Sequence, residues 1–508
     1  MVLNHIVEVN LDNFNNEEQN RRKKLYIMKE NGFNFPNDFK PNKYSVDINN
    51  DYKCYSNSQL KIMNIFVSVS GRILQKRIMG KSSFFLLKDC EGEIQLYITE
   101  KNFLNNFYSD MIKKLDLGDI IGVKGNLFKT QTGELSIYCI ELKLLTKSLR
   151  PLPNKFHGLY NKEIRYRQRY LDLISNKNLK YIFKIRSNIF ISIRKFMLEN
   201  KFLEVETPMI QNIPGGAIAR PFITYHNSLN LNLYLRISPE LYLKRLIIGG
   251  FDRIFEINRS FRNEGISTRH NPEFTMMEAY MAYSDYKDMM VFTENLLRNV
   301  VKSVIGHLKF KYGEYELDFE KSFCKMTMKQ AILRFNSDIK LSDLNDLEKI
   351  QHIVNILKIK VEENWGMGKL ISEIFNKTVE KKLVQPTFII DYPIEISPLS
   401  RRNNVNSDIA DRFELFISGY ELANGFSELN DSEDQKKRFL DQNQQEKIKF
   451  ENDSTFYDED YITALEYGLP PTSGLGIGID RLIMILTNQK SIRDVIFFPI
   501  LKPMNFKT

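Results

Sequence analysis

The sequence has 508 residues, of which 43% are hydrophobic and 27% are charged. This composition is typical of a globular protein and excludes a disordered or low-complexity chain. Because 72 Lys and Arg stand against 63 Asp and Glu, the formal charge of +9 permits a polyanionic partner without requiring one. The length predicts two or three domains, since one core rarely serves more than ~250–300 residues.

Cysteine usage and hydropathy predict a cytoplasmic protein. The four cysteines are scattered and form no CxxC pair, which argues against a disulfide framework or a structural zinc site. The N-terminal stretch MVLNHIVEVNLDN carries acidic residues, and no run of 18 apolar residues occurs. We therefore expect no membrane-spanning segment.

Residues 1–60 are polar and predict an N-terminal helical arm. The stretch EEQNRRKKLYIMKENG, residues 17–32, is typical of one basic helix that ends at Gly32. Positive charge on such a helix indicates either a solvated face or a surface for nucleic acid, and the sequence leaves both open.

Residues 61–149 show the pattern of short strands. In EIQLYIT, residues 93–99, apolar and polar positions alternate, as they do in NIFVSVSGRIL, residues 64–74. Five such strands, with a helical stretch between the third and the fourth, predict an OB-type β-barrel. Such barrels bind single-stranded nucleic acid by stacking bases on aromatic rings, although the fold also serves as a purely structural module.

Residues 150–174 are predicted to be a linker, because Pro151 and Pro153 stiffen a strongly basic stretch. A larger region of mixed helices and strands fills residues 175–508. Within it, residues 309–395 carry no chemical motif, and we interpret them as a helical insertion.

The stretch FRNEGISTRHNPEF, residues 261–274, is the most indicative of function. It follows the apolar run FDRIFEI, precedes the strand-like FTMMEAYMAY and has few apolar residues of its own. Such a layout is typical of a functional loop between two strands. Its Arg262, Glu264, His270 and Phe274 suit an anionic ligand with a planar ring, because Arg makes forked contacts to phosphate and an aromatic face stacks on a base. A solvated charged hairpin is the alternative.

Strand alternation after this loop places acidic side chains at internal positions. Glu278 and Tyr280 share one strand face, and in ELANGFSEL the residues Asn424, Phe426 and Glu428 share another. A buried carboxylate without a partner costs several kcal/mol, so each glutamate requires a cation. A structural salt bridge would serve for either one alone, but together they predict a pocket for a cationic ligand.

Glu414 and Glu421 flank Gly419 in a predicted hairpin. A two-residue turn at Gly419 and Tyr420 would place both carboxylates on one face, as oxygen ligands for Mg²⁺. The same register sends the Asn-Phe-Glu face of the second strand to the opposite side. A single site therefore requires a bulge, and Gly425 is its predicted position.

A glycine-rich strand enters a helix in SGLGIGIDRLIMILT, residues 473–487. Its glycines permit close backbone approach, and Arg481 in the first helical turn can reach a phosphate, although a salt bridge is the simpler role for Asp480 and Arg481. The stretch is neither a Walker A motif nor a clear Rossmann fingerprint. No nucleophile motif occurs, which favours phosphoryl-type activation through positioning and charge neutralisation.

These stretches together resemble the motifs of class II aminoacyl-tRNA synthetases, and closely those of the bacterial-type lysyl-tRNA synthetases. FLEVETPMI with Pro208 resembles motif 1, FRNEGISTRHNPEF motif 2 and GLGIGIDR motif 3. The segments RPLPNKFHGL, ELYLKRL, NGFSELND and IMGKSSFFLLKDCEGEIQLY are also similar, so the resemblance runs from about residue 60 to the end.

The resemblance implies an α+β fold, in which an OB-fold anticodon-binding barrel precedes a catalytic domain with a six-stranded antiparallel sheet flanked by helices. It further implies a homodimer formed through the motif 1 region. ATP as co-substrate and L-lysine would form lysyl-adenylate and pyrophosphate, and the lysyl group would then pass to the 3′ end of tRNA-Lys.

The resemblance also assigns residues to roles. Arg262 and Arg481 would be catalytic. ATP would contact Arg262, Glu264, His270, Phe274, Glu414, Glu421 and Arg481. Lysine would contact Gly216, Glu240, Arg262, Glu278, Tyr280, Asn424, Phe426 and Glu428. Glu414 and Glu421 would hold Mg²⁺, with up to three ions per subunit. Phe84, Gln95 and Glu134 of the barrel would read the U-rich anticodon.

Two alternatives remain open at this point. An aspartyl- or asparaginyl-type synthetase of the same subclass would present Arg or Lys to the substrate side chain, whereas the pocket predicted here is acidic. A non-catalytic paralogue that binds nucleic acid through the barrel would not need Arg262, Glu414, Glu421 and Arg481, all of which are present.

Overall fold

A computed structural model describes residues 15–104, 107–153, 161–362, 365–450 and 458–503. The chain divides into two compact units, Met1–Gly158 and Leu159–Thr508. Residues 154–160 of the predicted linker and residues 1–14 of the predicted arm lie outside the described residues. The second unit begins with the short helices α5 (Lys162–Arg167) and α6 (Arg169–Ser175).

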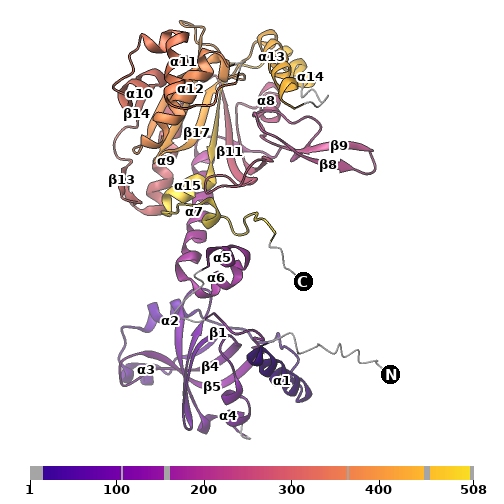
Figure 1. The fold of residues 1–508 in the computed structure, drawn as a ribbon. Helices are drawn as coiled ribbons and strands as arrows, with labels where there is room; N and C mark the ends of the chain where they lie inside the picture. Colours follow the sequence, from indigo (N-terminus) through magenta and orange to yellow (C-terminus); the bar gives the residue numbers. More distant parts are fainter. Residues whose placement is uncertain (1–14, 105–106, 154–160, 363–364, 451–457, 504–508) are drawn as a thin grey trace. The chain divides into compact units, whose positions relative to one another are not determined.

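The first unit contains a closed five-stranded barrel in the order β1-β2-β3-β5-β4, which confirms the predicted OB fold (Figure 1). Its strands are β1 (Phe66–Met79), β2 (Ser82–Lys88), β3 (Glu93–Thr99), β4 (Ile120–Lys129) and β5 (Leu135–Thr146). Alternation drives this architecture: Ile94, Leu96 and Ile98 of β3 are buried inside the barrel, and the residues between them face outward. The helical stretch after β3 is broken into η2 (Glu100–Asn102), α4 (Phe107–Asp110) and η3 (Ile112–Lys114).

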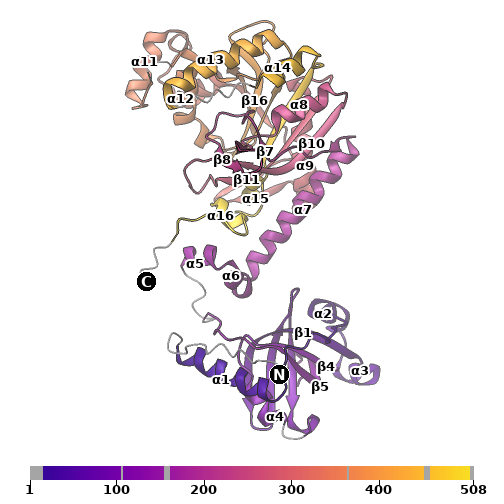
Figure 2. The same ribbon diagram turned by 90° about the vertical axis from the view of Figure 1, so that its right-hand side faces the viewer.

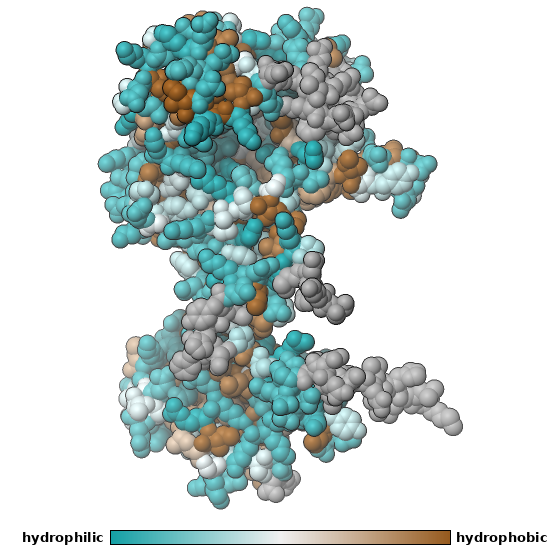
Figure 3. Space-filling model, in the orientation of Figure 1, coloured by the Kyte–Doolittle hydropathy of each residue, from teal (hydrophilic) through white to brown (hydrophobic). Residues whose placement is uncertain are grey.

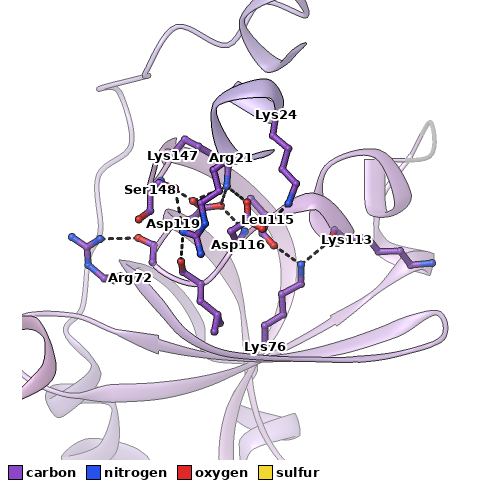
Figure 4. A network of polar contacts seen from close by, with 12 residues as sticks. Arg21, Lys24, Arg72, Lys76, Lys113, Leu115, Asp116, Asp119, Lys147 and Ser148 are labelled. Atoms are coloured by element: carbon purple, nitrogen blue, oxygen red, sulfur yellow. Dashed lines mark hydrogen bonds and ion pairs between the residues drawn. The ribbon is translucent and has the colours of Figure 1, made fainter. Parts of the chain in front are cut away.

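Three helices precede the barrel: α1 (Asn16–Glu30), α2 (Ser45–Tyr52) and α3 (Asn57–Met63). The basic helix α1 is anchored to the barrel by Arg21, which is only 4% exposed. Its guanidinium donates hydrogen bonds to the backbone carbonyls of Leu117, Ser148 and Arg150 (Figure 4). At least this arginine therefore serves the packing of α1, and is neither solvated nor available to nucleic acid.

The second unit is organised around an eight-stranded sheet in the order β14-β15-β16-β17-β18-β11-β10-β6. Its strands are β6 (Leu203–Glu204), β10 (Arg253–Phe261), β11 (Glu273–Ala282), β14 (Cys324–Thr327), β15 (Thr387–Pro393), β16 (Ile409–Ile417), β17 (Tyr420–Ser427) and β18 (Thr472–Gly478). The six central strands pair antiparallel, as predicted, and β14 and β6 each add a parallel strand at one edge.

One face of this sheet is covered by α7 (Lys177–Glu199), α9 (Tyr286–Ile305) and α15 (Ile479–Leu486) (Figure 2). Apolar residues at helical spacing, including Ile185, Ile189 and Ile193 of α7, pack with Phe255 and Met277 from the sheet. The polar side chains of the predicted site alternate with these core residues. They therefore project from the opposite face.

The remaining elements surround the sheet and complete the second unit. They are β7 (Ile210–Gln211), β8 (Phe222–His226), β9 (Leu231–Leu235), α8 (Glu240–Ile248), β12 (Lys309–Tyr312), β13 (Tyr315–Asp318), α10 (Met328–Phe335), η4 (Asp343–Asn345), α11 (Leu347–Ile356), α12 (Met367–Thr378), η5 (Glu380–Lys382), η6 (Ile394–Ile396), α13 (Ser432–Phe450), α14 (Glu459–Glu466) and α16 (Ile492–Val495). Helices α10 to α12 of the predicted insertion pack around a core of their own, while β14 and β15 of the same stretch join the main sheet. No helix within the described ranges is both long and apolar enough to cross a bilayer.

Candidate active site

A cavity of about 470 Å³ opens on the face of the sheet that α7 and α9 leave uncovered. It is lined by nearly all the residues that the sequence predicted for the catalytic unit: Gly216, Glu240, Arg262, Glu264, His270, Phe274, Glu278, Tyr280, Glu421, Asn424, Phe426, Glu428 and Arg481. Glu414 does not line the cavity; it lies on β16, directly opposite Asn424 of β17. The structure therefore assembles one site from five segments that are far apart in the sequence.

Residues 262–272 form the loop between β10 and β11, as predicted. The Arg262 guanidinium lies 5.1 Å from the centre of the Phe274 ring, and its Nε is buried without a hydrogen-bond partner among the described residues. Burial lowers the pKa of Arg262, and the nearby carboxylates of Glu421, Glu264 and Glu278 oppose that shift. A buried cation with an unused N–H is suited to bind an anion.

His270 lies on the same loop, where its Nδ1 is 3.0 Å from the Ser267 hydroxyl. Burial, followed by the positive charge of Arg481, lowers the pKa of His270, so the imidazole is neutral at pH 7. A neutral imidazole can still donate one N–H to a phosphate oxygen. Arg269 also lines the cavity, but it is held by an ion pair of 3.0 Å to Glu380 and by the Tyr420 ring.

The two charged residues of the glycine-rich motif have separate roles. Asp480 forms a 2.6 Å ion pair with Arg186 and accepts a hydrogen bond from the Thr275 N–H, so its role is structural. Arg481 instead lines the cavity from the first turn of α15, and its Nη1 lies 3.5 Å from Glu421 Oε2. The simple salt-bridge interpretation therefore holds for Asp480, whereas Arg481 faces the site.

Three buried glutamates form one end of the cavity. Glu278 accepts hydrogen bonds from the Ser238 hydroxyl at 2.8 Å and the Tyr280 hydroxyl at 3.1 Å. Burial and the neighbouring Glu240 raise the pKa of Glu278 to about 7. Burial raises the pKa of Glu428 well above its ordinary value, although Lys244 opposes the shift. This end of the cavity therefore has an excess of buried acid and favours a cationic ligand.

Two glycines make room for these carboxylates. A Cβ on Gly474 would lie 2.0 Å from Glu428 Oε1, and one on Gly216 would lie 2.9 Å from the Glu240 Cβ. Gly216 also has a φ of +83°, which side chains rarely adopt. The close backbone approach predicted for the glycine-rich strand thus occurs at Gly474, where it admits a carboxylate.

The hairpin between β16 and β17 corrects two predictions. Its turn is formed by Ser418 and Gly419, both at positive φ, one residue earlier than predicted. The predicted bulge at Gly425 is wrong, because the ladder is regular through that residue. Gly425 is required for another reason: a Cβ there would lie 2.6 Å from the Phe413 ring.

The bulge lies at Leu422. Leu415 pairs with Ala423 and Phe416 pairs with Glu421, which leaves Leu422 without an opposite residue. This extra residue brings Glu421 to the face that also carries Asn424, Phe426 and Glu428. The single site that the sequence required is therefore present, with its bulge three residues earlier than predicted.

Glu414 and Glu421 provide a donor set that fits Mg²⁺. Glu414 forms a 2.5 Å ion pair with Arg412 and accepts a hydrogen bond from the Tyr392 hydroxyl at 2.8 Å. Burial raises the pKa of Glu414 to about 7; Arg412 opposes this, and the negative charge of Glu421 adds to it. The described residues contain no cluster of three or more His, Cys, Asp or Glu, so phosphate oxygens would have to complete the coordination.

Two residues that contact the site were missed by the sequence reasoning. Arg412 lines the cavity and its Nε donates to Asn424 Oδ1 at 3.0 Å. Lys244 is fully buried and pairs with both Glu240 and Glu428. The spacing could have indicated both residues. Arg412 precedes Glu414 by two strand positions and Lys244 follows Glu240 by four helical positions, so each shares a face with a predicted site residue.

The barrel carries the second predicted site. Phe84 on β2 pairs with Tyr97 on β3, and their ring centres are 5.0 Å apart. Tyr97 in turn lies 5.8 Å from both Phe128 and Tyr138, so four aromatic rings form a platform on the outer face. The sequence reasoning named only the first of these four rings.

The other two predicted barrel residues lie on β3 and just before β5. Gln95 is half-buried on β3 and pairs with Ser136 of β5, and the exposed Glu134 lies in the turn that precedes β5. Polar groups thus flank an aromatic platform, an arrangement suited to unstacked bases.

Both units of the chain match known protein families. Residues 161–502 match the family described as tRNA synthetases class II (D, K and N), and residues 67–145 match the OB-fold nucleic acid binding domain. The chain is 67% identical to the lysine–tRNA ligase of Buchnera aphidicola subsp. Baizongia pistaciae, over 96% of this chain and 99% of that protein.

More distant bacteria give the same result. The chain is 56% identical to the lysine–tRNA ligase of Pectobacterium atrosepticum and to the heat-inducible lysine–tRNA ligase of Escherichia coli K12, in each case over 96% of this chain and 97% of the relative. The family model alone covers the aspartate, lysine and asparagine enzymes. The identities over nearly the full length restrict the assignment to the lysine enzymes. The chain therefore belongs to the class II tRNA synthetases, within the family of bacterial lysine–tRNA ligases.

Proposed function

We propose that the chain activates L-lysine with ATP in this cavity and transfers the lysyl group to the 3′ end of tRNA-Lys. The observation that carries the proposal is the distribution of charge. Glu240, Glu278 and Glu428 are buried at one end, while Arg262 and Arg481 occupy the other. An amino acid with a cationic side chain and an anionic nucleotide fit these two ends, whereas an acidic substrate would meet like charge.

The lysine ammonium groups would be shared among the acids. Glu428, Glu278 and the Tyr280 hydroxyl would surround the ε-ammonium, beside the Phe426 ring. The α-ammonium would bind Glu240 and the backbone of Gly216. The Asn424 amide would contact the lysine carboxylate, because Arg412 accounts for its oxygen and leaves its N–H groups available.

ATP would bind beside the loop that follows β10. Its adenine would lie between Phe274 and Arg481, with Glu264 at the exocyclic amine and His270 at the outer phosphates. Arg262 would bridge the α-phosphate and the lysine carboxylate, because its guanidinium side chain lines a cavity that both groups enter. By holding the two anions in contact and balancing the charge of the pentavalent phosphorus, Arg262 would favour attack of the carboxylate on the α-phosphate.

Glu414 and Glu421 would hold Mg²⁺ against the ATP phosphates, with up to three ions per subunit. Enzymes of this family use ATP and Mg²⁺. When bound there, the ion supplies charge neutralisation to the leaving pyrophosphate. A bound cation would favour the ionised form of Glu414, because it opposes the raised pKa of that carboxyl.

The barrel would select the tRNA. Phe84, with Tyr97 beside it, would stack on anticodon bases, while Gln95 and Glu134 would read their edges.

The division into an arm (1–60), an anticodon-binding barrel (61–149), a linker (150–174) and a catalytic domain (175–508) belongs to the same proposal. So does a cytoplasmic location, which the free thiols at Cys54, Cys90 and Cys324 would tolerate.

A homodimer through the motif 1 region would cover exposed apolar side chains. Ile191 and Leu198 on α7 are both more than 60% exposed, as is Ile223 on the β8–β9 hairpin. Apolar patches are visible on that hairpin in Figure 3. Light scattering should give twice the mass of the chain, and Ile223→Lys should shift the protein towards the monomer. A monomeric parent protein would contradict the dimer.

Amino-acid-dependent pyrophosphate exchange tests the activity directly. We expect exchange with lysine and none with aspartate or asparagine. Exchange with aspartate would instead identify an aspartyl-type enzyme. No exchange with any amino acid, together with intact RNA binding, would favour the non-catalytic paralogue.

A further inference from the structure

Lys244 is a fully buried lysine at the acidic end of the cavity. It projects from α8, one turn after Glu240, and its Nζ donates to Glu240 Oε1 at 2.6 Å. The same ammonium forms a close ion pair with Glu428 Oε2, although Glu428 lies beyond β17. Of the three glutamates at this end, Lys244 therefore joins the two that lie furthest apart in the sequence.

Both carboxylates also line the cavity. Glu428 Oε1 is buried, has no hydrogen-bond partner among the described residues and lies against Gly474, which lines the cavity. Glu240 also lines the cavity and uses Oε1 for Lys244. Each glutamate thus has one oxygen held by Lys244 and a side chain at the cavity wall.

The net charge of this cluster matches that of a ligand with two ammonium groups. Glu240, Glu278 and Glu428 together with Lys244 leave an excess of two negative charges when all are ionised. Free lysine brings two ammonium groups to this end of the cavity, and Arg262 is placed to meet its carboxylate. Without Lys244 the excess would be three charges, and one acid would hold a proton instead of binding the substrate.

We propose that Lys244 is a positioning residue for lysine recognition: by holding one oxygen of Glu240 and one of Glu428, it fixes the other two oxygens for the substrate's two ammonium groups. This inference rests on the proposed lysine site. Lys244 acts through the two glutamates and need not touch the substrate. The Phe426 ring, 5.5 Å from its Nζ, and the buried Tyr461 hydroxyl complete its surroundings.

Lys244→Met tests the inference, because it keeps the length of the side chain and removes the charge. Loss of a neighbouring cation shifts carboxyl pKa values by about one unit or more, so we expect the KM for lysine to rise at least ~10-fold at pH 7. The KM for ATP should stay within about twofold. Arg245→Met is the matched control: Arg245 is the next residue of α8 and pairs with Asp458 and Asp460, but does not line the cavity.

The pH dependence of the lysine KM distinguishes a positioning role of Lys244 from a purely structural role. The titratable groups that face Lys244 are Glu240 on its own helix, Glu428 after β17 and Tyr461 on α14. In Lys244→Met the pKa of Glu428, which burial already raises, should rise further, so the lysine KM should recover between pH 7 and pH 9. A loss of the same size at every pH, shared by lysine and ATP, would overturn the inference.

Two further variants cover the other outcomes. If Glu428→Gln leaves the lysine KM unchanged, the proposed lysine site is wrong; if it raises the KM while Lys244→Met does not, only the inference about Lys244 fails. Should Lys244→Met not fold, the Glu240→Gln background removes one of the two uncompensated acids. There, adding Lys244→Met should raise the lysine KM above that of Glu240→Gln alone, and equal values would contradict the role of Lys244.

Discussion

Each unit of the molecule contains a fully buried lysine between two carboxylates. In the first unit Lys147 lies 2.5 Å from Asp116 and 2.7 Å from Asp119 (Figure 4). In the second unit Lys244 holds Glu240 and Glu428 in the same way. In both clusters a buried lysine ammonium contacts two carboxylates. The clusters differ in whether the remaining carboxylate oxygens have partners within the protein.

Around Lys147 those oxygens are used by the protein itself. Asp119 Oδ1 accepts from the Ser148 N–H at 2.8 Å, and Asp116 Oδ1 pairs with Lys24 at 2.6 Å. Burial acts to raise the pKa of Asp116, but the hydrogen bonds from Lys147 and Lys24 outweigh it and hold the pKa below its usual value. The network joins α1, the barrel and the segment after β5.

Around Lys244 the opposite holds. Burial raises the pKa of Glu278, and it also raises the pKa of Glu428 despite the opposing charge of Lys244. Glu428 Oε1 has no hydrogen-bond partner within the described residues. A buried ionic cluster that is complete within the protein stabilises its fold. One that retains excess charge and an unused oxygen indicates a place for a ligand.

Lys147→Met should give the largest effect of the variants that test this comparison. It leaves Asp119, which is fully buried, without its cation, so the first unit should lose ~3–5 kcal/mol of unfolding free energy. Urea unfolding measures this, with Lys124→Met as control, because the exposed Lys124–Glu141 pair should be worth less than ~1 kcal/mol. Pyrophosphate exchange should persist in every variant that remains folded. Equal losses of unfolding free energy in Lys147→Met and Lys124→Met would show that the buried network contributes no more than an exposed ion pair.

Glu428→Gln should weaken lysine binding, whereas Lys147→Met should lower the free energy of unfolding. The amide leaves the ε-ammonium of lysine without its counter-charge, so the lysine KM should rise by the equivalent of ~2–4 kcal/mol. Pyrophosphate exchange at varied lysine and ATP measures it. Glu141→Gln, on the exposed barrel surface, is the control and should change neither KM. A large loss of unfolding free energy in Glu428→Gln would contradict the contrast with Lys147.

Phe84→Ala extends the comparison to the barrel surface. Loss of base stacking should weaken aminoacylation of tRNA by ~1–3 kcal/mol, while adenylate formation in the other unit remains unchanged. The control is Tyr44→Ala, which removes an exposed aromatic ring away from the platform. Equal loss in exchange and in tRNA charging would show that Phe84 does not act through the anticodon.

The smallest effect concerns pH. The raised pKa of Glu278, about 7, means that the folded protein keeps a proton which the unfolded chain releases near pH 4.5. This group therefore opposes folding increasingly as the pH rises from 4.5 to 7, whereas Asp116, with its lowered pKa, contributes stability that is present above pH 3.8 and is lost as the pH falls through its folded-state pKa.

Lysine binding should reverse the shift at Glu278 and release protons near neutral pH. Titration calorimetry in two buffers of different ionisation enthalpy would measure the release, and the lysine KM should rise by up to ~10-fold between pH 7 and pH 6. Binding without proton release at pH 7 would show that Glu278 is already ionised in the free protein.

Much of this site could be predicted from the sequence, because short-range periodicity is enough for it. Alternation along a strand placed Glu278 with Tyr280, and Asn424 with Phe426 and Glu428, and the structure confirms both sets. The OB barrel followed from the same period of two. The resemblance to known synthetase motifs added Gly216 and Glu240, which periodicity alone would not have selected.

Register and partner choice could not be predicted in the same way. The bulge was expected at Gly425 because glycine is common at bulges, but Gly425 is needed for contact with Phe413 and the extra residue is Leu422. The basic helix α1 indicated solvent or nucleic acid, and its Arg21 instead lies buried against backbone carbonyls.

The sequence by itself determined which residues have the chemistry for lysine, ATP and tRNA, because residue type and local period are properties of short segments. Only the tertiary structure decided which of them meet. A one-residue bulge turned Glu421 to the face of Glu428, and the contact between α8 and Glu428, the residue that follows β17, placed Lys244 between two carboxylates. Both outcomes depend on contacts between distant segments, which the local pattern of neither segment contains.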